Sequence, residues 1–187
     1  RLFIVGEGRG FENYTRGLDE MVSHLRIDEV VFAGAVTQSE LNAYYRLADA
    51  FLCLSEREGF CVALQEAMHF GLPVVAYDAG AVRETLRGGG ILLQDKAPEM
   101  VAEILDRVTR GTDLRRAVLA SQAKAVAAIR GTDFGALLLD RLKPVLGGGD
   151  GGPAFGGALG ARTEGPAFGE ALRNGQVLVT PFRTGAS

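Results

Sequence analysis

The chain has no tryptophan, only two cysteines and only two histidines among its 187 residues. Cys53 and Cys61 are too few for the disulfide framework of a small secreted domain, so we expect reduced thiols in a cytoplasmic protein. An aromatic fraction of 7% argues against a platform that stacks carbohydrate rings. His24 and His69 have no second histidine, cysteine or aspartate at ligand spacing, so we predict no metal site.

Strong charge and long apolar runs are also missing. The net charge of −3 gives no reason to expect nucleic acid or an anionic membrane surface as a partner. No run approaches the roughly 20 apolar residues of a membrane span, and we expect no signal peptide before the first strand. We expect a cytoplasmic location, with the cytoplasmic face of the membrane as the alternative. Because residues 2–6 already read as a strand, we predict that the chain is a piece of a longer polypeptide.

What the sequence does contain is a regular alternation of short apolar runs and longer amphipathic segments, within a composition that is 47% hydrophobic. This alternation is typical of βα units around a parallel sheet, so we predict an α/β, Rossmann-like fold with helices flanking the sheet. Predicted strands cover 2–5, 30–32, 50–54, 73–76 and 91–93. Predicted helices cover 11–26, 38–48, 60–70, 81–87, 98–110, 113–130 and 132–145.

The composition changes after Leu146. Residues 147–175 are rich in Gly, Ala and Pro and contain a near-repeat, with 153–159 echoed by 166–172. Such a segment has little to bury, so we predict a linker between a domain at 1–146 and the apolar run at 176–182. That run, within 176–187, reads as the first strand of a following domain or as an edge strand of this one. The first is favoured because the linker is long.

Two carboxylates surround the N-terminus of the predicted helix at 60–70. Glu58 lies in the loop after the strand at 50–54, and Glu66 lies two turns into the helix. On one helix they would lie roughly 12 Å apart, which is wide for two ligands of one metal ion or for a glycosidase pair. The spacing suits a ligand with hydroxyls at both ends and phosphate between them, because helix N-termini favour phosphate. A nucleotide sugar is such a ligand. A solvated loop charge and a surface glutamate are the alternative.

The residues around this pair carry a resemblance to a known family. The runs 58–60, 66–68 and 71–76 (Glu-Gly-Phe, Glu-Ala-Met and Gly-Leu-Pro-Val-Val-Ala) resemble the signature of group 1 retaining glycosyltransferases of the GT-B fold. Further matches lie at 2–8, 31–36 and 48–51. The resemblance covers about residues 1–146. It implies the C-terminal, nucleotide-sugar-binding domain of such an enzyme, with the N-terminal domain of the GT-B fold missing.

At the sugar end, the resemblance implies that Glu58 is the catalytic residue at the transferred sugar. The backbone N–H groups of Gly59, Phe60 and Cys61 would face the sugar hydroxyls or the distal phosphate. Cys61 departs from the family pattern, which usually has glycine there, so a side chain stands beside the proposed sugar pocket. A tolerated small residue is a simpler interpretation of Cys61 than a reactive thiol.

At the nucleotide end, the resemblance implies that Glu66 binds the ribose hydroxyls and that the backbone near Val36 contacts the base. Gly6 and Gly8 would let the chain pass close to the nucleotide. Together with the next glycine they form half of a dinucleotide fingerprint, but Phe11 stands where that fingerprint needs glycine, which disfavours a nicotinamide enzyme. Glu84 and Thr85 open a later helix and either edge the donor pocket or supply an ordinary helix N-terminus.

The predicted function is transfer of a sugar from a nucleoside diphosphate donor to a saccharide or lipid-linked acceptor with retention, without a metal or other cofactor. The run 77–85 resembles bacterial polysaccharide mannosyltransferases, which favours GDP-mannose over UDP-linked sugars. The family also places an Arg and a Lys at the leaving diphosphate, in a βα unit upstream of this sequence, and we expect the chain alone to be inactive. The alternative is a non-catalytic nucleotide-sugar-binding or regulatory module. A further domain downstream is also expected.

Overall fold

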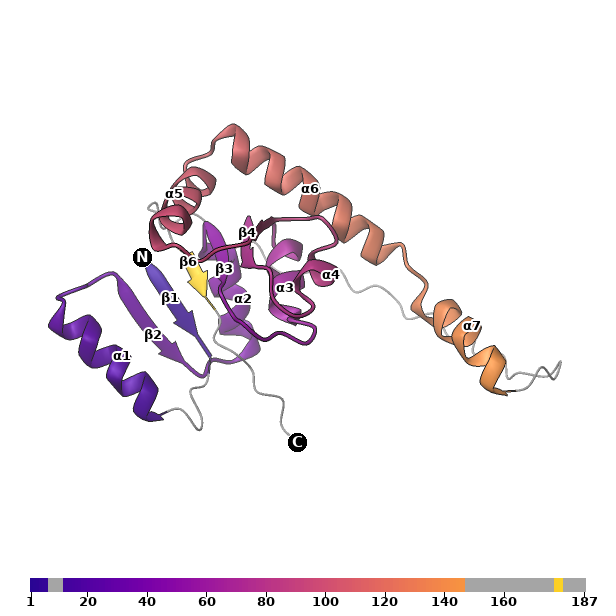
Figure 1. The fold of residues 1–187 in the computed structure, drawn as a ribbon, viewed down its shortest axis with the longest axis horizontal. Helices are drawn as coiled ribbons and strands as arrows, with labels where there is room; N and C mark the ends of the chain where they lie inside the picture. Colours follow the sequence, from indigo (N-terminus) through magenta and orange to yellow (C-terminus); the bar gives the residue numbers. More distant parts are fainter. Residues whose placement is uncertain (7–11, 147–176, 180–187) are drawn as a thin grey trace.

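The computed structural model of the chain describes residues 1–6, 12–146 and 177–179, which form alternating strands and helices (Figure 1). All of the strands and helices predicted within 1–146 are present, with ends displaced by at most two residues. In chain order they are β1 (Leu2–Val5), α1 (Glu12–His24), β2 (Val30–Gly34), α2 (Gln38–Leu47), β3 (Ala50–Cys53), α3 (Val62–His69), β4 (Val74–Tyr77), α4 (Val82–Leu86), β5 (Ile91–Leu93), α5 (Pro98–Thr109), α6 (Asp113–Arg130), α7 (Phe134–Leu146) and β6 (Val177–Val179).

The strands form one sheet in the order β2-β1-β6-β3-β4-β5, and every pairing is parallel. Helices connect successive strands, as parallel pairing requires. The predicted α/β, Rossmann-like class is therefore confirmed. The chain moves outward from β1 to β2 and then returns to build β3, β4 and β5 on the other side. The strand order thus reverses at the position that β6 occupies.

The position of β6 corrects the interpretation of the C-terminal apolar run. Val177–Val179 pairs with β1 on one side and with β3 on the other, so it is neither an edge strand nor part of another sheet. The preference for a following domain rested on the length of the linker at 147–175. Linker length is a weak argument, because the entropy cost of closing a loop grows only slowly with its length. The strand gives no support to a following domain; the predicted linker and residues 180–187 lie outside the described residues.

Strand alternation divides the apolar residues between the two faces of the sheet. Phe51 and Cys53 of β3 point to one face, which α2, α3 and α4 cover, and Ala50 and Leu52 point to the other, which α5 covers. The two faces are packed by separate clusters of buried side chains. Since successive side chains of a strand alternate, the sequence of β3 places Cys53 on the same face as Phe51, and the packing of the helices makes this the face of α3.

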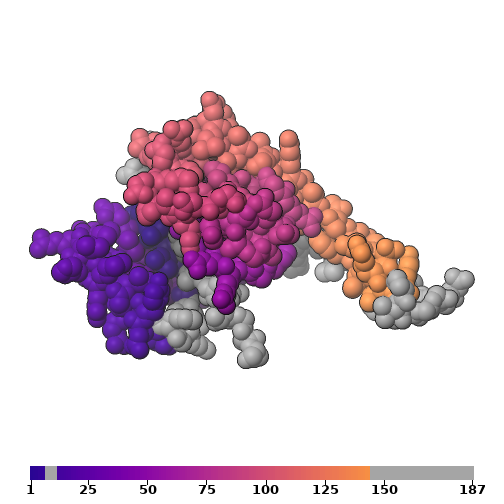
Figure 2. Space-filling model, in the orientation of Figure 1, coloured from indigo at the N-terminus to yellow at the C-terminus, as the bar shows by residue number. Residues whose placement is uncertain are grey.

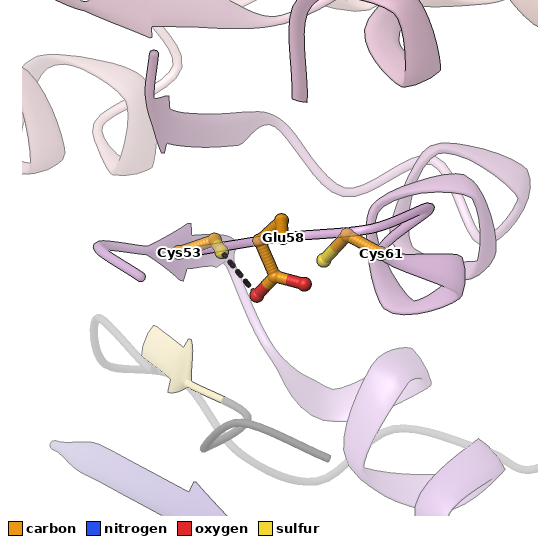
Figure 3. A group of neighbouring side chains, drawn as sticks. All are labelled: Cys53, Glu58 and Cys61. Atoms are coloured by element: carbon orange, nitrogen blue, oxygen red, sulfur yellow. Dashed lines mark hydrogen bonds between the residues drawn. The ribbon is translucent and has the colours of Figure 1, made fainter. Parts of the chain in front are cut away.

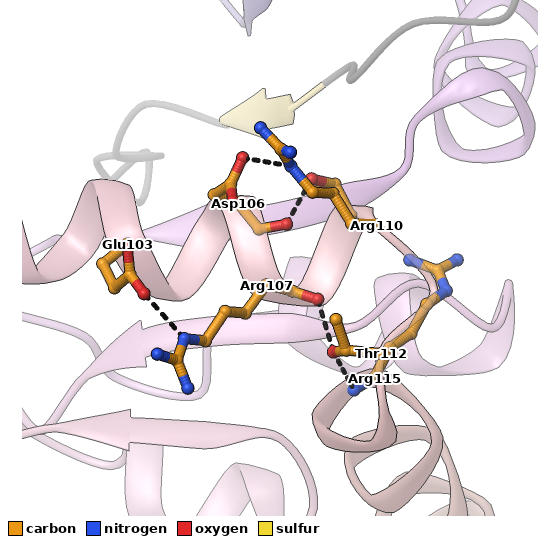
Figure 4. A network of polar contacts seen from close by, with 7 residues as sticks. Glu103, Asp106, Arg107, Arg110, Thr112 and Arg115 are labelled. Atoms are coloured by element: carbon orange, nitrogen blue, oxygen red, sulfur yellow. Dashed lines mark hydrogen bonds and ion pairs between the residues drawn. The ribbon is translucent and has the colours of Figure 1, made fainter.

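Arg115, in the first turn of α6, joins three parts of the fold, and Figure 4 shows it beside Thr112 at the start of that helix. Its Nη1 donates to the carbonyl oxygens of Asp49, just before β3, and of Val108 in α5, both at 2.7 Å. Thr112, the N-cap of α6, donates to the carbonyl oxygen of Arg107 at 2.7 Å. A cation near the C-terminus of α5 also suits the helix dipole. These contacts fix the turn between α5 and α6 against the start of β3.

The last helix stands apart from the sheet. Figure 2 shows α7 projecting from the body of the molecule, and its side chains Phe134, Leu137, Leu138, Leu139 and Leu142 are exposed. Among the described residues, no helix combines the length and the apolarity that crossing a bilayer requires.

The start of α2 and the end of α3, next to the predicted site residues, have recognisable caps. Thr37 and Glu40 form a capping box at the start of α2, in which the Thr37 N–H donates to Glu40 Oε2 at 2.7 Å. That hydrogen bond lowers the pKa of Glu40. Gly71, at a φ of 74°, ends α3 in a Schellman motif, with the N–H of Leu72 donating to the carbonyl of Ala67 at 3.0 Å. The left-handed backbone explains why glycine occupies position 71.

The folded chain should lose stability in acid, because three of its carboxylates accept hydrogen bonds that lower their pKa values. Hydrogen bonds from Lys96 and Gln94 lower the pKa values of Glu56 and Asp78, as the Thr37 N–H lowers that of Glu40. Because these pKa values are lower in the folded chain, the unfolded chain binds more protons in acid, and their stabilisation is lost as the pH falls through the carboxyl range. We expect the urea unfolding midpoint to fall between about pH 6 and about pH 3.

The matched control for this prediction is Glu40→Gln, which keeps the capping hydrogen bond but cannot titrate. It should show a smaller fall in the midpoint over the same pH range. An equal midpoint at both pH values, or a higher one in acid, would contradict the assignment of these carboxylates as stabilising partners.

Candidate functional site

Those predicted site residues that the structure describes lie at or after the carboxyl ends of the strands, on both sides of the point where the strand order reverses. Gly6 follows β1 and donates its N–H to the carbonyl of Gly34 at the end of β2, at 2.9 Å. The loop with Glu58 follows β3, and Gly80 follows β4. Open parallel sheets bind their ligands at this edge, at the switch in strand order. The position therefore suits a ligand site.

The loop from Leu54 to Cys61 leads into α3, which begins at Val62 rather than at residue 60 as predicted. The reason is the backbone of Cys61, which has a φ of 33° in the left-handed region and therefore cannot belong to the helix. Gly59 and Phe60 are exposed, and Phe60 keeps 58% of its surface accessible. In the described residues, Cys61 makes no side-chain cap, which leaves the N-terminus of α3 available to an anion.

The neighbouring loop after β4 holds this segment in place. The N–H of Ala81 donates to the carbonyl of Glu58 at 3.1 Å, and the buried Thr85 hydroxyl donates to the carbonyl of Phe60 at 3.1 Å. Gly80 lies so close that a Cβ added there would stand 2.2 Å from the Glu58 carbonyl oxygen. Glycine is therefore required at position 80, and the backbone around Glu58 is fixed by β4 and α4.

The side chain of Glu58 lies between two thiols (Figure 3). Cys53, at the end of β3, is buried, while Glu58 and Cys61 are partly buried. The Cys53 Sγ lies 3.8 Å from Glu58 Oε1, and the two sulfurs and a carboxylate oxygen all lie within 4.8 Å of one another. This is the one group of three or more potential metal ligands among the described residues.

The two thiols differ in acidity because they share one hydrogen bond. The Cys61 thiol donates to the Cys53 sulfur, which lowers the pKa of Cys53 to about 7. For the same reason the pKa of Cys61 is raised well above its ordinary value, and burial and the charges of Cys53 and Glu58 raise it further. Cys53 is the more acidic of the pair near neutral pH.

Glu66 has a different partner from Glu58. It lies partly buried in the second turn of α3, where the buried Tyr45 of α2 donates its hydroxyl to Glu66 Oε2 at 3.0 Å. This hydrogen bond orients the carboxylate and leaves Glu66 Oε1 to accept from a ligand. Val36, just before α2, is partly buried and packs against the core, so its backbone rather than its side chain is suited to ligand contact.

Gly8, which was predicted as a site residue, lies outside the described residues.

Some residues of the site were not found from the sequence. Cys53 was read only as a reduced thiol, and its contact with Glu58 depends on the turn of the loop. Nothing in the sequence indicated the role of Gly80 except that the residue is a glycine. Thr85 was considered as an edge of the pocket or as part of an ordinary helix N-terminus, and its hydrogen bond to Phe60 was not predicted. Contacts between two loops at one sheet edge are not visible in the spacing of residues within either loop.

Comparison with known proteins shows that the chain matches a protein family. The family model described as glycosyl transferases group 1 matches residues 1–125, well over half of the chain. This range includes the loop with Glu58, the whole of α3 and the loop after β4. The match therefore includes the described residues that form the site.

Individual relatives are similar over the same region. A GDP-mannose-dependent alpha-mannosyltransferase of Mycobacterium tuberculosis (strain CDC 1551 / Oshkosh) is 35% identical over 127 residues, 64% of this chain and 31% of that protein. A D-inositol 3-phosphate glycosyltransferase of Frankia alni is 33% identical over 137 residues, 71% of this chain and 32% of that protein. A phosphatidyl-myo-inositol mannosyltransferase of Mycobacterium leprae is 35% identical over 130 residues, which are 67% of this chain and 33% of that protein. The chain spans about a third of the length of these curated relatives.

Proposed function

The chain belongs to the group 1 glycosyltransferases, and we propose that it is the nucleotide-sugar-binding domain of a retaining hexosyltransferase. The family match confirms the resemblance drawn from the motifs, and the parallel sheet is the α/β unit of a GT-B fold. The proposed enzyme transfers a sugar from a nucleoside diphosphate donor to a saccharide or lipid-linked acceptor. This chain would supply the donor side, and other parts of the parent protein would bind the acceptor.

The observation that carries this proposal is the position of Glu58. Its loop is held by Ala81 and Thr85 at the carboxyl edge of the sheet, immediately before the N-terminus of α3. A carboxylate there can accept hydrogen bonds from sugar hydroxyls, while the N–H groups at the start of α3 attract the diphosphate. Glu66, oriented by Tyr45, would accept from the ribose hydroxyls.

In this scheme the domain accelerates transfer by orientation and by electrostatics. Glu58 and the backbone of Gly59, Phe60 and Cys61 would hold the sugar, so that the acceptor attacks one face of the anomeric carbon. The positive end of α3 would stabilise negative charge as the diphosphate leaves. The scheme routes no step through a metal ion. The close approach of chain to nucleotide would occur at Gly6 and Gly8, with the base near Val36.

GDP-mannose is the donor that we propose first. The run at 77–85 resembles mannosyltransferases, and a similar protein from Mycobacterium tuberculosis is named as GDP-mannose-dependent. UDP-linked sugars are the alternative, because the base would be read by backbone groups rather than by a diagnostic side chain.

Calorimetric titration of the chain with GDP, UDP and ADP tests the proposal directly. We expect GDP to bind most tightly, and Glu66→Ala to weaken it by about 10- to 100-fold, the value of one or two hydrogen bonds to a charged group. Glu56→Ala is the matched control, since Glu56 is exposed and pairs with Lys96 at 2.5 Å. Absence of binding for all three nucleotides would overturn the proposal, and tighter binding of UDP would overturn the choice of donor.

A further inference from the structure

The cluster of Cys53, Glu58 and Cys61 has a composition that sugar binding does not require. It brings two thiols and a carboxylate together within 4.8 Å, from the end of β3, the following loop and the N-cap of α3 (Figure 3). Sugar hydroxyls are bound by carboxylates and amides, and two sulfurs add nothing to that task. Two sulfurs and an oxygen are, however, a donor set for a thiophilic metal ion.

The distances are close to those of a zinc site. In a tetrahedral site, Zn–S bonds of about 2.3 Å and Zn–O bonds of about 2.0 Å separate two sulfurs by about 3.8 Å and a sulfur from an oxygen by about 3.5 Å. The Cys53 Sγ and Glu58 Oε1 stand 3.8 Å apart, and no pair in the cluster exceeds 4.8 Å.

The backbone holds these ligands before any ion arrives. Cys53 is fixed in the buried sheet, and Glu58 is fixed through its carbonyl by the N–H of Ala81. Cys61 has a left-handed backbone, which turns its side chain back toward Cys53 and Glu58 instead of continuing into α3. Partial burial of Glu58 and Cys61 gives an ion access from solvent. The cluster is therefore ordered on one side and accessible on the other.

We propose that Cys53, Glu58 and Cys61 bind Zn²⁺ as three protein ligands, with water in the fourth position. Binding displaces the thiol protons, so up to two protons are released for each ion bound. Zinc is favoured over Mg²⁺, Ca²⁺ and Mn²⁺ because thiolates are soft ligands and these ions prefer oxygen. The proposal departs from the prediction of no metal site, which was argued from the histidines and the Glu58–Glu66 pair and did not consider the two cysteines together.

Zinc at this site would regulate rather than assist sugar transfer. This consequence depends on the proposed function, in which the Glu58 carboxylate accepts hydrogen bonds from the sugar. A carboxylate bound to zinc is turned toward Cys53 and Cys61 and has lost the charge that favours those hydrogen bonds. Zinc and the sugar of the donor would therefore compete for Glu58, whereas the nucleotide end of the donor would be unaffected.

Titration of the reduced 187-residue chain with Co²⁺ as a spectroscopic substitute for Zn²⁺ tests the site. We expect a thiolate-to-cobalt charge-transfer band in the near ultraviolet, visible bands of a tetrahedral ion, and loss of both on addition of Zn²⁺. The chain has only two cysteines, so a thiolate band can arise only from Cys53 and Cys61. A thiol count on the same sample confirms that both are reduced. No thiolate band with two free thiols present would overturn the proposal.

Substitutions identify the ligands. Cys61→Ser and Glu58→Gln should each weaken zinc binding by at least about tenfold, which is the smallest loss expected even for a residue outside the coordination sphere. Cys61 is partly buried, so its serine variant should fold even if Cys53→Ser does not; circular dichroism verifies this. Glu56→Gln and the double variant His24→Ala with His69→Ala are controls and should bind zinc normally. Normal binding by Cys61→Ser would refute the assignment.

Competition separates the metal site from the proposed function. Saturating Zn²⁺ should weaken binding of GDP-mannose and leave binding of GDP, which has no sugar, unchanged. If zinc binds but GDP-mannose is unaffected, the zinc site stands and the role of Glu58 at the sugar fails. If the cobalt band is absent while nucleotides bind, the zinc site fails and the proposed function stands.

Discussion

In the proposed glycosyltransferase, replacement of Glu58 by alanine is expected to lower turnover by at least about a hundredfold, as for other groups aimed at a transition state. The physical reason is that one fixed carboxylate would orient the transferred sugar at the start of α3. Its backbone is held by Ala81 and packed against Gly80, so another side chain has little freedom to take over its position. The measurement is the steady-state rate of nucleoside diphosphate release from the nucleotide sugar.

Glu56→Ala is the matched control for Glu58→Ala. It removes a carboxylate two residues away that is exposed and paired with Lys96, and turnover should stay close to that of the parent. Circular dichroism of both variants excludes unfolding as the cause of a loss. Near-normal turnover of Glu58→Ala would remove Glu58 from the site, and equal losses in both variants would show that the effect is not specific.

The second large effect is on stability, at the buried side chain of Gln122. This residue of α6 is 1% exposed and bridges two backbone groups at the start of β4. Its Nε2 donates to the carbonyl of Leu72 at 2.6 Å, and its Oε1 accepts from the N–H of Val74 at 2.8 Å. Gln122→Met has a similar size but leaves both groups buried without these partners. Each such group costs about 1–3 kcal/mol, so we expect a loss of about 2–6 kcal/mol in the free energy of unfolding.

Urea denaturation of the full chain measures this loss. Lys124→Met, an exposed position on the same helix, is the control and should change the free energy of unfolding by less than about 0.5 kcal/mol. A loss under about 1 kcal/mol in Gln122→Met would mean that water or a backbone shift satisfies Leu72 and Val74 instead.

Much of the fold could be predicted from local patterns. The short apolar runs became strands because alternate residues such as Phe51 and Leu52 are buried on opposite faces of one sheet. The capping box of Thr37 and Glu40 and the helix stop at Gly71 were also predictable, because each depends on contacts within a few residues. The start of α3 was displaced because the left-handed backbone of Cys61 is imposed by the loop.

Pairing between distant segments was not predictable in the same way. The strand at 177–179 was identified as a strand, but its place between β1 and β3 was not. An apolar run indicates that its residues suit an extended, buried backbone. It does not indicate which other strands will pair with that strand in the sheet. The same limit applies to Gln122, whose partners Leu72 and Val74 lie about 50 residues away in the chain.

By itself, the sequence determined the α/β class, the family and the loop that carries Glu58. Each of these can be recognised from short segments in which residues close together in the chain have a characteristic spacing. Only the tertiary structure decided that Cys53 and Cys61 lie on either side of Glu58, that the loop after β4 holds it, and that β6 completes the sheet. These are contacts between segments, and they exist only once strand alternation and helix packing have brought separate parts of the chain to the same edge.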